Sequence, residues 1–152
     1  MRRKEKEITD RAEMENILRR GEICHLAMAH DNIPYVVAVN YGYADNVLYI
    51  HSAPEGRKID MLRRNNRVCF QVATDVAIIN TDSVHNCNTK YKSVIGYGTA
   101  SIIRDDPGKK VGLDVLMAQY ASAGQEYPQT LLDKKVIIKI DIESLTGKQS
   151  LD

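Results

Sequence analysis

One stretch decides the fold: Tyr49-Ile50-His51-Ser52-Ala53-Pro54-Glu55-Gly56-Arg57-Lys58, followed by Ile59-Asp60-Met61-Leu62-Arg63-Arg64-Asn65-Asn66 and Arg67-Val68-Cys69-Phe70. It reads as an apolar strand end, a turn with an imidazole, a hydroxyl and a glycine, a short helix, and a second strand. Arg57 and Lys58 stand at the start of the helix. A helix N-terminus has unpaired backbone N–H groups and a partial positive charge, so two cations there favour an anion, most simply a phosphate. The alternative is a turn shaped for conformational reasons, with a solvated basic pair.

Length and charge narrow the class of protein. The 152 residues, 43% of them hydrophobic, can bury a core without metals or disulfides, so we expect one domain over residues 1–152. A net charge of +1 gives no reason to expect nucleic acid or an anionic membrane as a partner. The basic start lacks the apolar segment of a secretory signal, and no apolar run approaches the ~20 residues that span a bilayer. We therefore expect a cytoplasmic protein.

The cysteines agree with a reducing compartment. Cys24 and Cys69 lie in apolar strand patterns and are expected in the core as free thiols. Cys87 lies with His85 in a polar, loop-like segment. A metal site or a nucleophile there is an alternative, but two ligands in one loop are a weak signal.

The rest of the chain predicts a mainly antiparallel β fold. A helix is expected over 9–20, ended by Gly21, and a second helix opens at Asp105-Asp106-Pro107 with Val111 and Leu113 in its apolar stripe. A helical turn is expected over 130–133, residues 75–80 are ambiguous, and residues 81–90 read as a loop. Apolar, β-branched segments predict strands over 22–29, 35–41, 47–50, 67–73, 91–103 and 136–142.

Two glycines shape the longest of these strands. Gly96 and Gly98 inside a strand predict a bulge, a bend or a close backbone approach, as curling a sheet into a small barrel requires. Strands without βαβ alternation then predict a mainly β (β+α) fold: a six-stranded antiparallel split barrel with packed helices.

The sequence lacks the motifs of several enzyme classes. There is no Gly-x-Ser-x-Gly elbow, and the four histidines do not have zinc-protease spacing. Gly96-Tyr97-Gly98 lies within a strand and has no third glycine, so a doubly wound nicotinamide-binding fold is not expected.

Three segments, taken in their order along the chain, resemble those of a known protein family. Residues 34–41, 49–70 and 90–98 are together similar to the FMN-binding split β-barrels related to pyridoxamine 5′-phosphate oxidase, and within them to the nitroimidazole-resistance-like branch. The resemblance runs from Ile23 to about Leu145 and is specific as a set. It implies a homodimer with a flavin at the interface, FMN in the first place and FAD as the alternative.

The resemblance also implies roles for single residues. The strand along the isoalloxazine ring would be Val36, Val37, Ala38, Val39 and Asn40; Tyr49 and Ile50 would flank the flavin; Ser52, Arg57 and Lys58 would bind its phosphate; and Tyr91, Lys92 and Ser93 would come from the second subunit. Guanidinium binds phosphate bidentately and ammonium as a point charge, in agreement with the charge argument. His51 matches a histidine near the ring that can deliver a proton near neutral pH, or else it is a turn histidine with local bonds.

Two features depart from the family pattern. Ala38 stands where many relatives have a second proline, and the chain has no Trp, which pyridoxamine 5′-phosphate oxidases use near their C-terminus for substrate. Oxidation of pyridoxamine phosphate itself is therefore not expected.

The resemblance implies an FMN-dependent oxidoreductase acting on a small molecule, nitroaromatic reductase-like, with NAD(P)H as candidate reductant. A flavin-binding carrier without turnover is the alternative. A haem-binding relative, with His51 or His85 as axial ligand, is a third.

Overall fold

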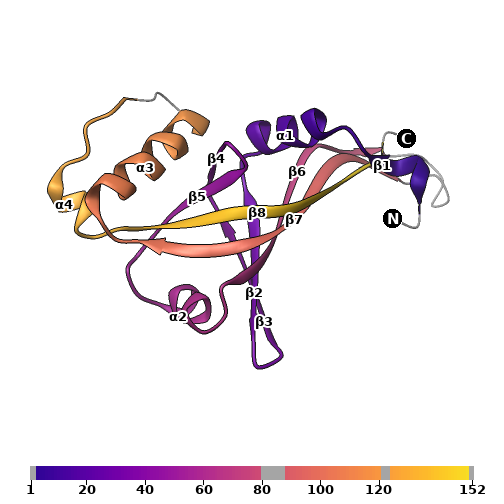
Figure 1. Ribbon diagram of the computed structural model, residues 1–152. Helices are drawn as coiled ribbons and strands as arrows, with labels where there is room; N and C mark the ends of the chain where they lie inside the picture. Colours follow the sequence, from indigo (N-terminus) through magenta and orange to yellow (C-terminus); the bar gives the residue numbers. More distant parts are fainter. Residues whose placement is uncertain (1–2, 80–87, 121–123, 151–152) are drawn as a thin grey trace.

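A computed structural model describes residues 3–79, 88–120 and 124–150, which form one antiparallel sheet with helices packed on it (Figure 1). The sheet runs in the order β3-β2-β6-β7-β8-β5-β4, and β1 pairs with β8. The strands are β1 Glu7–Ile8, β2 Cys24–His30, β3 Ile33–Val39, β4 Gly42–Ala44, β5 Val47–Ser52, β6 Arg67–Ile79, β7 Asn88–Ile103 and β8 Val136–Ser150. The helices are the 3-10 turn η1 Lys4–Lys6, α1 Arg11–Arg20, α2 Arg57–Arg64, α3 Asp106–Tyr120 and α4 Gln129–Leu132. The mainly β architecture with packed helices confirms the predicted fold class.

Tight turns join the first strands, as the sequence predicted. Asp31 and Asn32 have φ of 50° and 60°, and Asp45 and Asn46 have 47° and 65°. Asp and Asn tolerate this left-handed backbone and form the two-residue turns that match strand twist. These pairs close the hairpins β2–β3 and β4–β5, which lie at opposite ends of the sheet, so the four strands do not form the continuous meander that their order in the sequence suggests.

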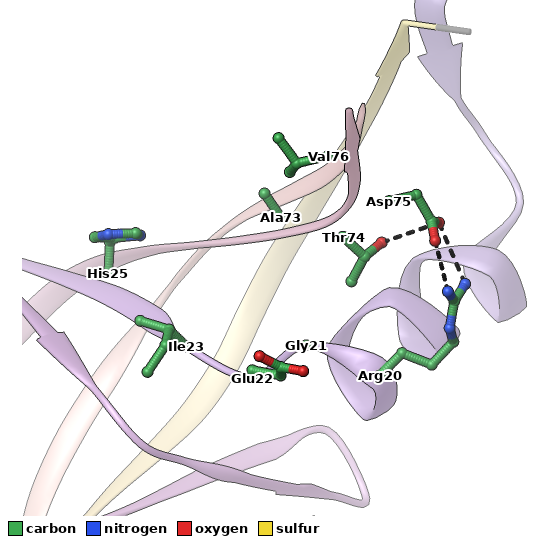
Figure 2. Close-up of a pocket in the computed structure, with 9 residues that line it drawn as sticks. All are labelled: Arg20, Gly21, Glu22, Ile23, His25, Ala73, Thr74, Asp75 and Val76. Atoms are coloured by element: carbon green, nitrogen blue, oxygen red, sulfur yellow. Dashed lines mark hydrogen bonds and ion pairs between the residues drawn. The ribbon is translucent and has the colours of Figure 1, made fainter. Parts of the chain in front are cut away.

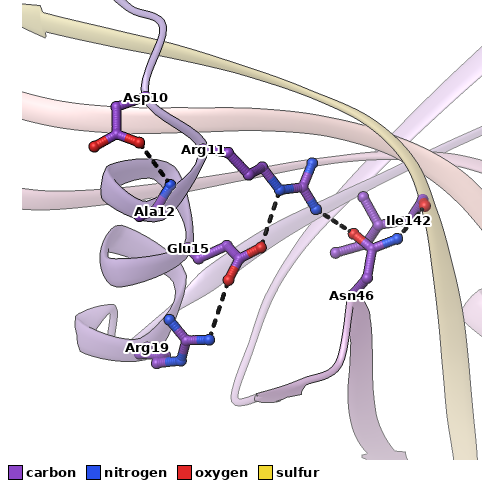
Figure 3. Close-up of polar contacts among 7 residues, drawn as sticks. All are labelled: Asp10, Arg11, Ala12, Glu15, Arg19, Asn46 and Ile142. Carbon is purple, nitrogen blue, oxygen red and sulfur yellow. Dashed lines mark hydrogen bonds and ion pairs between the residues drawn. The ribbon is translucent and has the colours of Figure 1, made fainter.

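Helix α1 is held in place by a network of side chains (Figure 3). Asp10 caps the helix by accepting a hydrogen bond from the Ala12 amide at 3.0 Å. Glu15 accepts from Arg11 at 3.0 Å and from Arg19 at 3.1 Å. Arg11 also donates to Asn46, whose amide donates to the Ile142 carbonyl at 2.8 Å. The network joins α1 to the turn before β5 and to β8.

The core lies inside the curved sheet. Alternate residues of the strands point inward, and α1 and α2 add Ile17, Leu18, Ile59 and Leu62. Tyr41 is fully buried, and its hydroxyl donates to the Leu18 carbonyl. Gly42 lets α3 approach: an added Cβ would lie 2.6 Å from backbone atoms of Val115 and Leu116. Helix α3 therefore packs directly on β4.

The glycine-containing strand has the predicted irregularity. The register between β7 and β8 shifts between Tyr97 and Gly98, which leaves Glu143 outside the ladder. The Glu143 carboxylate accepts from Arg67 at 2.8 Å and from Thr99 at 2.6 Å. A second shift, between Thr74 and Ala77, bends the pairing of β6 with β7.

The strand count and several strand ends differ from expectation. The described residues form eight strands rather than the predicted six; the two additional strands, β1 and β4, are too short to show a periodic pattern in the sequence. Strand β6 continues through the ambiguous residues 75–79, and β8 continues to Ser150 across a polar segment. Pairing with the long strand β7 stabilises both extensions despite their weak hydrophobic pattern.

Two residues predicted to lie in the core are not fully buried, and two predicted loop residues lie outside the described part of the chain. Val111 is 54% exposed, because α3 turns its face with Leu113 and Leu116 to the sheet. Cys24 is buried as predicted, with its thiol pKa raised to about 12 by burial, but Cys69 is only half-buried on the outer face of β6. Strand β7 begins at Asn88, within the predicted loop, and His85 and Cys87 lie outside the described residues.

Candidate functional site

The predicted anion site lies at the start of α2. Gly56 precedes the helix with φ 115°, no side chain caps the N-terminus, and a Cβ at Gly56 would meet no atom within 4 Å. Arg57 and Lys58 are the first two helical residues, as predicted. The helix therefore begins with amides that no side chain caps, beside two cationic side chains.

Arg57 connects this helix to strand β3. Its guanidinium carbon lies 4.4 Å from the centre of the Tyr35 ring. A guanidinium stacked on an aromatic face keeps its in-plane N–H donors available. A cavity of about 280 Å³ lies beside it, lined by Arg57, Asp60, Met61 and Arg64.

Strand β3 ends the sheet and offers an open backbone edge. It pairs with β2 on one side and, in the described part of the chain, with no strand on the other. Val37 and Val39 pack against the core, whereas Val36, Ala38 and Asn40 are exposed. In an antiparallel edge strand alternate residues direct their N–H and C=O groups away from the neighbouring strand, so part of the backbone of the predicted ring-binding segment 36–40 is open beside Tyr35 and its stacked Arg57.

The prediction that His51 and Ser52 lie in a turn was wrong, because strand β5 includes both residues. Both residues belong to the strand, so their side chains point to opposite faces. Ile50 and Ser52 are 1% and 7% exposed and point into the core, so only the backbone of Ile50 can face a ligand. Tyr49 and His51 point outward, toward the side of the sheet that α3 covers.

The charges around His51 favour an anion. Burial and the positive charges of Lys135 and Lys58 lower the pKa of the His51 imidazole, which is therefore neutral at pH 7. Burial also lowers the pKa of the half-buried Lys58 ammonium. Across residues 3–79, 88–120 and 124–150, no carboxylate forms an ion pair with Arg57, Lys58 or Lys135. Cations without a protein counter-charge are suited to a ligand anion.

The remaining predicted residues lie at the far end of the molecule. Ser93 and Ile103 are ten residues apart on β7, which is about 33 Å along the strand at about 3.3 Å per residue. Ile103 pairs with Ile137, and Ile137 pairs with His51. One chain therefore does not bring Tyr91, Lys92 and Ser93 to Arg57. Lys92 forms an ion pair with Glu13 at 2.7 Å, and the buried Ser93 hydroxyl donates to the Lys148 carbonyl at 3.4 Å.

A groove of about 550 Å³ adjoins these residues (Figure 2). Arg20 and Asp75 form its ion pair at 2.6 Å, and Ile23, His25 and Val76 also line it. Its residues Ala73 and Thr74 pair in register with Ser93 and Lys92. Exposed apolar side chains continue from the groove over the outer sheet face: Ile23, Val36, Val76, Ile78, Ile95 and Tyr97.

A second cavity, on the outer side of β5, was not predicted. It has about 430 Å³ and is lined by His51, by α3, by α4 with the segment before it, and by Lys135. The apolar stripe of α3 was interpreted as core, which its buried Leu113 and Leu116 confirm. Nothing in the sequence pattern shows that Met117 and Leu131 also line a cavity, because this depends on how α4 returns to the sheet.

The described residues contain no cluster of three or more potential metal-binding side chains. Within the same ranges, no helix is long and apolar enough to cross a membrane.

Comparison with known proteins adds to this geometry. Residues 10–149 match the family model described as pyridoxamine 5′-phosphate oxidase. The structure is similar to that of a candidate 5-nitroimidazole antibiotic resistance protein from Bacteroides thetaiotaomicron, with 30% identity, a TM-score of 0.83, and coverage of 94% of this chain and 86% of that one. It is also similar to an FAD-binding protein from Mesorhizobium loti, with 28% identity, a TM-score of 0.68, and coverage of 93% and 95%.

Among curated proteins, an uncharacterized protein of Rhizobium meliloti (strain 1021) is 32% identical over 91 residues. That match covers 60% of this chain and 53% of the relative, about half of its length.

Proposed function

The chain belongs to the pyridoxamine 5′-phosphate oxidase family, and from this premise we propose that it is a flavin-binding oxidoreductase that acts on a small molecule. The carrying observation is the pair Arg57 and Lys58 at an uncapped helix N-terminus, without carboxylate partners in the described ranges and next to the open edge of β3. A phosphate monoester dianion matches two cations and free amides.

In this proposal the chain's own residues hold and orient the cofactor, FMN in the first place. Arg57 and Lys58 bind the phosphate, and the backbone of 36–40 and Tyr49 contact the ring. The Ser52 side chain is buried and faces the core, so it cannot donate to the phosphate as predicted. In the proposal the backbone amides at the start of α2 donate instead. Bound flavin would supply the electron transfer, while the protein fixes it and excludes water.

His51 is the proposed proton-handling residue. It is half-buried, and its lowered pKa keeps the imidazole neutral at pH 7, with one nitrogen able to donate and the other able to accept. The neutral imidazole can accept a proton at its free ring nitrogen, and the positive charges of Lys58 and Lys135 then favour release of that proton.

We further propose a homodimer with the flavin at the interface. Tyr91, Lys92 and Ser93 lie too far along β7 to reach Arg57 of the same chain, so they would serve the site of a second copy. The exposed side chains of Ile95 and Tyr97 on the same strand support an interface on this face, because a second copy would remove them from water.

The proposed substrate class is nitroaromatic. Its support is the 30% identity to the candidate 5-nitroimidazole resistance protein from Bacteroides thetaiotaomicron. NAD(P)H is the proposed reductant.

The test is cofactor uptake followed by reduction. The protein is purified, its absorbance spectrum is recorded, and flavin-free protein is titrated with FMN and FAD. FMN binding, bleaching of the bound flavin by NAD(P)H, and reoxidation by a nitroimidazole support the proposal. A protein that takes up neither flavin contradicts it, and bound flavin that no donor reduces indicates a carrier.

A further inference from the structure

The cavity between α3, α4 and β5 is lined by apolar side chains and by two basic ones. Leu113 and Leu116 are buried in its wall, and Met117 and Leu131 are half-buried beside them. His51 and Lys135 are its half-buried basic side chains, whereas its one carboxylate, Glu126, is exposed. At about 430 Å³ the cavity lies within the size range of small-molecule sites.

The wall that closes this cavity is held firmly. The Lys109 ammonium, 9% exposed, donates to the Leu132 carbonyl at 2.8 Å and lies 3.4 Å from Asp106. The Tyr127 hydroxyl donates to Asp114 at 2.9 Å. These bonds tie α4 and the segment before it to α3, so the cavity is largely preformed.

The cavity has a positive charge, on Lys135, that no carboxylate in the described part of the chain balances in an ion pair. Lys135 has no carboxylate partner among residues 3–79, 88–120 and 124–150, and its positive charge is felt at His51. A ligand carboxylate would provide the missing counter-charge, and an apolar ring would cover the leucines.

From this geometry we propose that the cavity binds a small aromatic monoanion, with its ring against Leu113, Leu116 and Leu131 and its acid group at Lys135 and His51. As a statement about the substrate, this rests on the proposed flavin function and narrows the nitroaromatic class to compounds with an acid group, because it places the anion beside the residue proposed to handle protons. As a statement about a binding site, it stands on the cavity alone.

Calorimetric titration of the flavin-loaded protein tests the site with matched probes. Benzoate has the ring and the charge, benzamide is its neutral isostere, and acetate has the charge without the ring. We expect benzoate to bind at least tenfold tighter than either control compound, since both a charge-assisted bond and apolar burial contribute. Equal binding of benzoate and benzamide, or no binding of benzoate, overturns the proposal.

Adjacent lysines provide matched variants. Lys135→Met keeps the length of the side chain and should remove the preference for benzoate over benzamide, and Lys135→Arg should retain it. Lys134→Met changes the exposed neighbour and should leave all three affinities unchanged. A preference that survives Lys135→Met overturns the role of Lys135.

The occupant could instead be part of the flavin, and competition distinguishes the two. Benzoate that binds only flavin-free protein and is displaced by FMN overturns the proposal. A protein that takes up no flavin contradicts the proposed function, while the same titration of the protein as purified still tests the cavity.

Discussion

The sharpest test of the phosphate site is the double replacement of Arg57 and Lys58 by alanine. A charge-assisted hydrogen bond contributes about 1.5–3 kcal/mol. Arg57 is exposed, so we take the lower end of this range for it, and Lys58 is half-buried without a carboxylate partner in the described ranges, so we take a value near the middle. The sum predicts a loss of about 3–4 kcal/mol in FMN binding, or roughly 200- to 1,000-fold in Kd.

The assay compares FMN with riboflavin, which lacks the phosphate. Flavin-free wild-type and variant proteins are titrated with each flavin, and binding is followed by quenching of flavin fluorescence. The wild type should prefer FMN, and the double variant should lose this preference while its riboflavin affinity stays the same. Arg63→Ala is the control, because Arg63 lies at the other end of α2 and pairs with Asp60 at 3.6 Å.

Two results would refute this reasoning. A double variant that keeps the wild-type ratio of FMN to riboflavin affinity removes the phosphate from Arg57 and Lys58. An equal loss in Arg63→Ala would show a diffuse effect of positive charge.

Further predictions concern the interface, the packing of α3 and His51. Tyr97→Lys, on the exposed face of β7, should convert the proposed dimer to a monomer in light scattering and weaken FMN binding; an intact dimer would exclude this face. Gly42→Ala should lower the free energy of unfolding in urea by about 1–3 kcal/mol, because its Cβ would lie 2.6 Å from the α3 backbone, and unchanged stability would show that α3 shifts freely. The folded-state pKa of His51 is lowered, so the unfolded chain binds this proton first below about pH 6.5 and stability falls there. His51→Gln should therefore lose less stability than the wild type between pH 7.5 and 5.5, and an equal loss would assign the effect to other groups. The same variant should bind FMN normally but slow reoxidation of reduced flavin by a nitroimidazole in stopped-flow; an unchanged rate would make His51 structural.

The sequence predicted the elements around the proposed phosphate site well, because their signals are local. Helix α2 begins at Arg57 as expected, and Asp31-Asn32 and Asp45-Asn46 form the predicted turns. A cap, a turn and an apolar face each depend on residues within a few positions, so a single sequence contains them.

Features set by long-range pairing were harder to predict. The extension of β8 to Ser150 depends on β7, which lies more than forty residues earlier in the chain. Ser52 looked like a turn hydroxyl, but pairing with Val136 makes it a buried strand residue. Likewise, the cavity lined by His51, α3 and α4 depends on where α4 returns to the sheet, and no local sequence pattern shows this position.

The position of α3 and α4 in the chain has one more consequence. They lie between Ile103 and Val136, and the flanking strands close on each other through the Ile103–Ile137 pair, so the helical segment is an excursion from a hairpin (Figure 1). Local unfolding of such an excursion leaves the β7–β8 ladder intact. Its amides should exchange with deuterium faster than those of the ladder. The excursion supplies most of the lining of the cavity beside His51 and none of the residues at the start of α2, so substitutions within it can change ligand preference at this cavity without altering the proposed anion site.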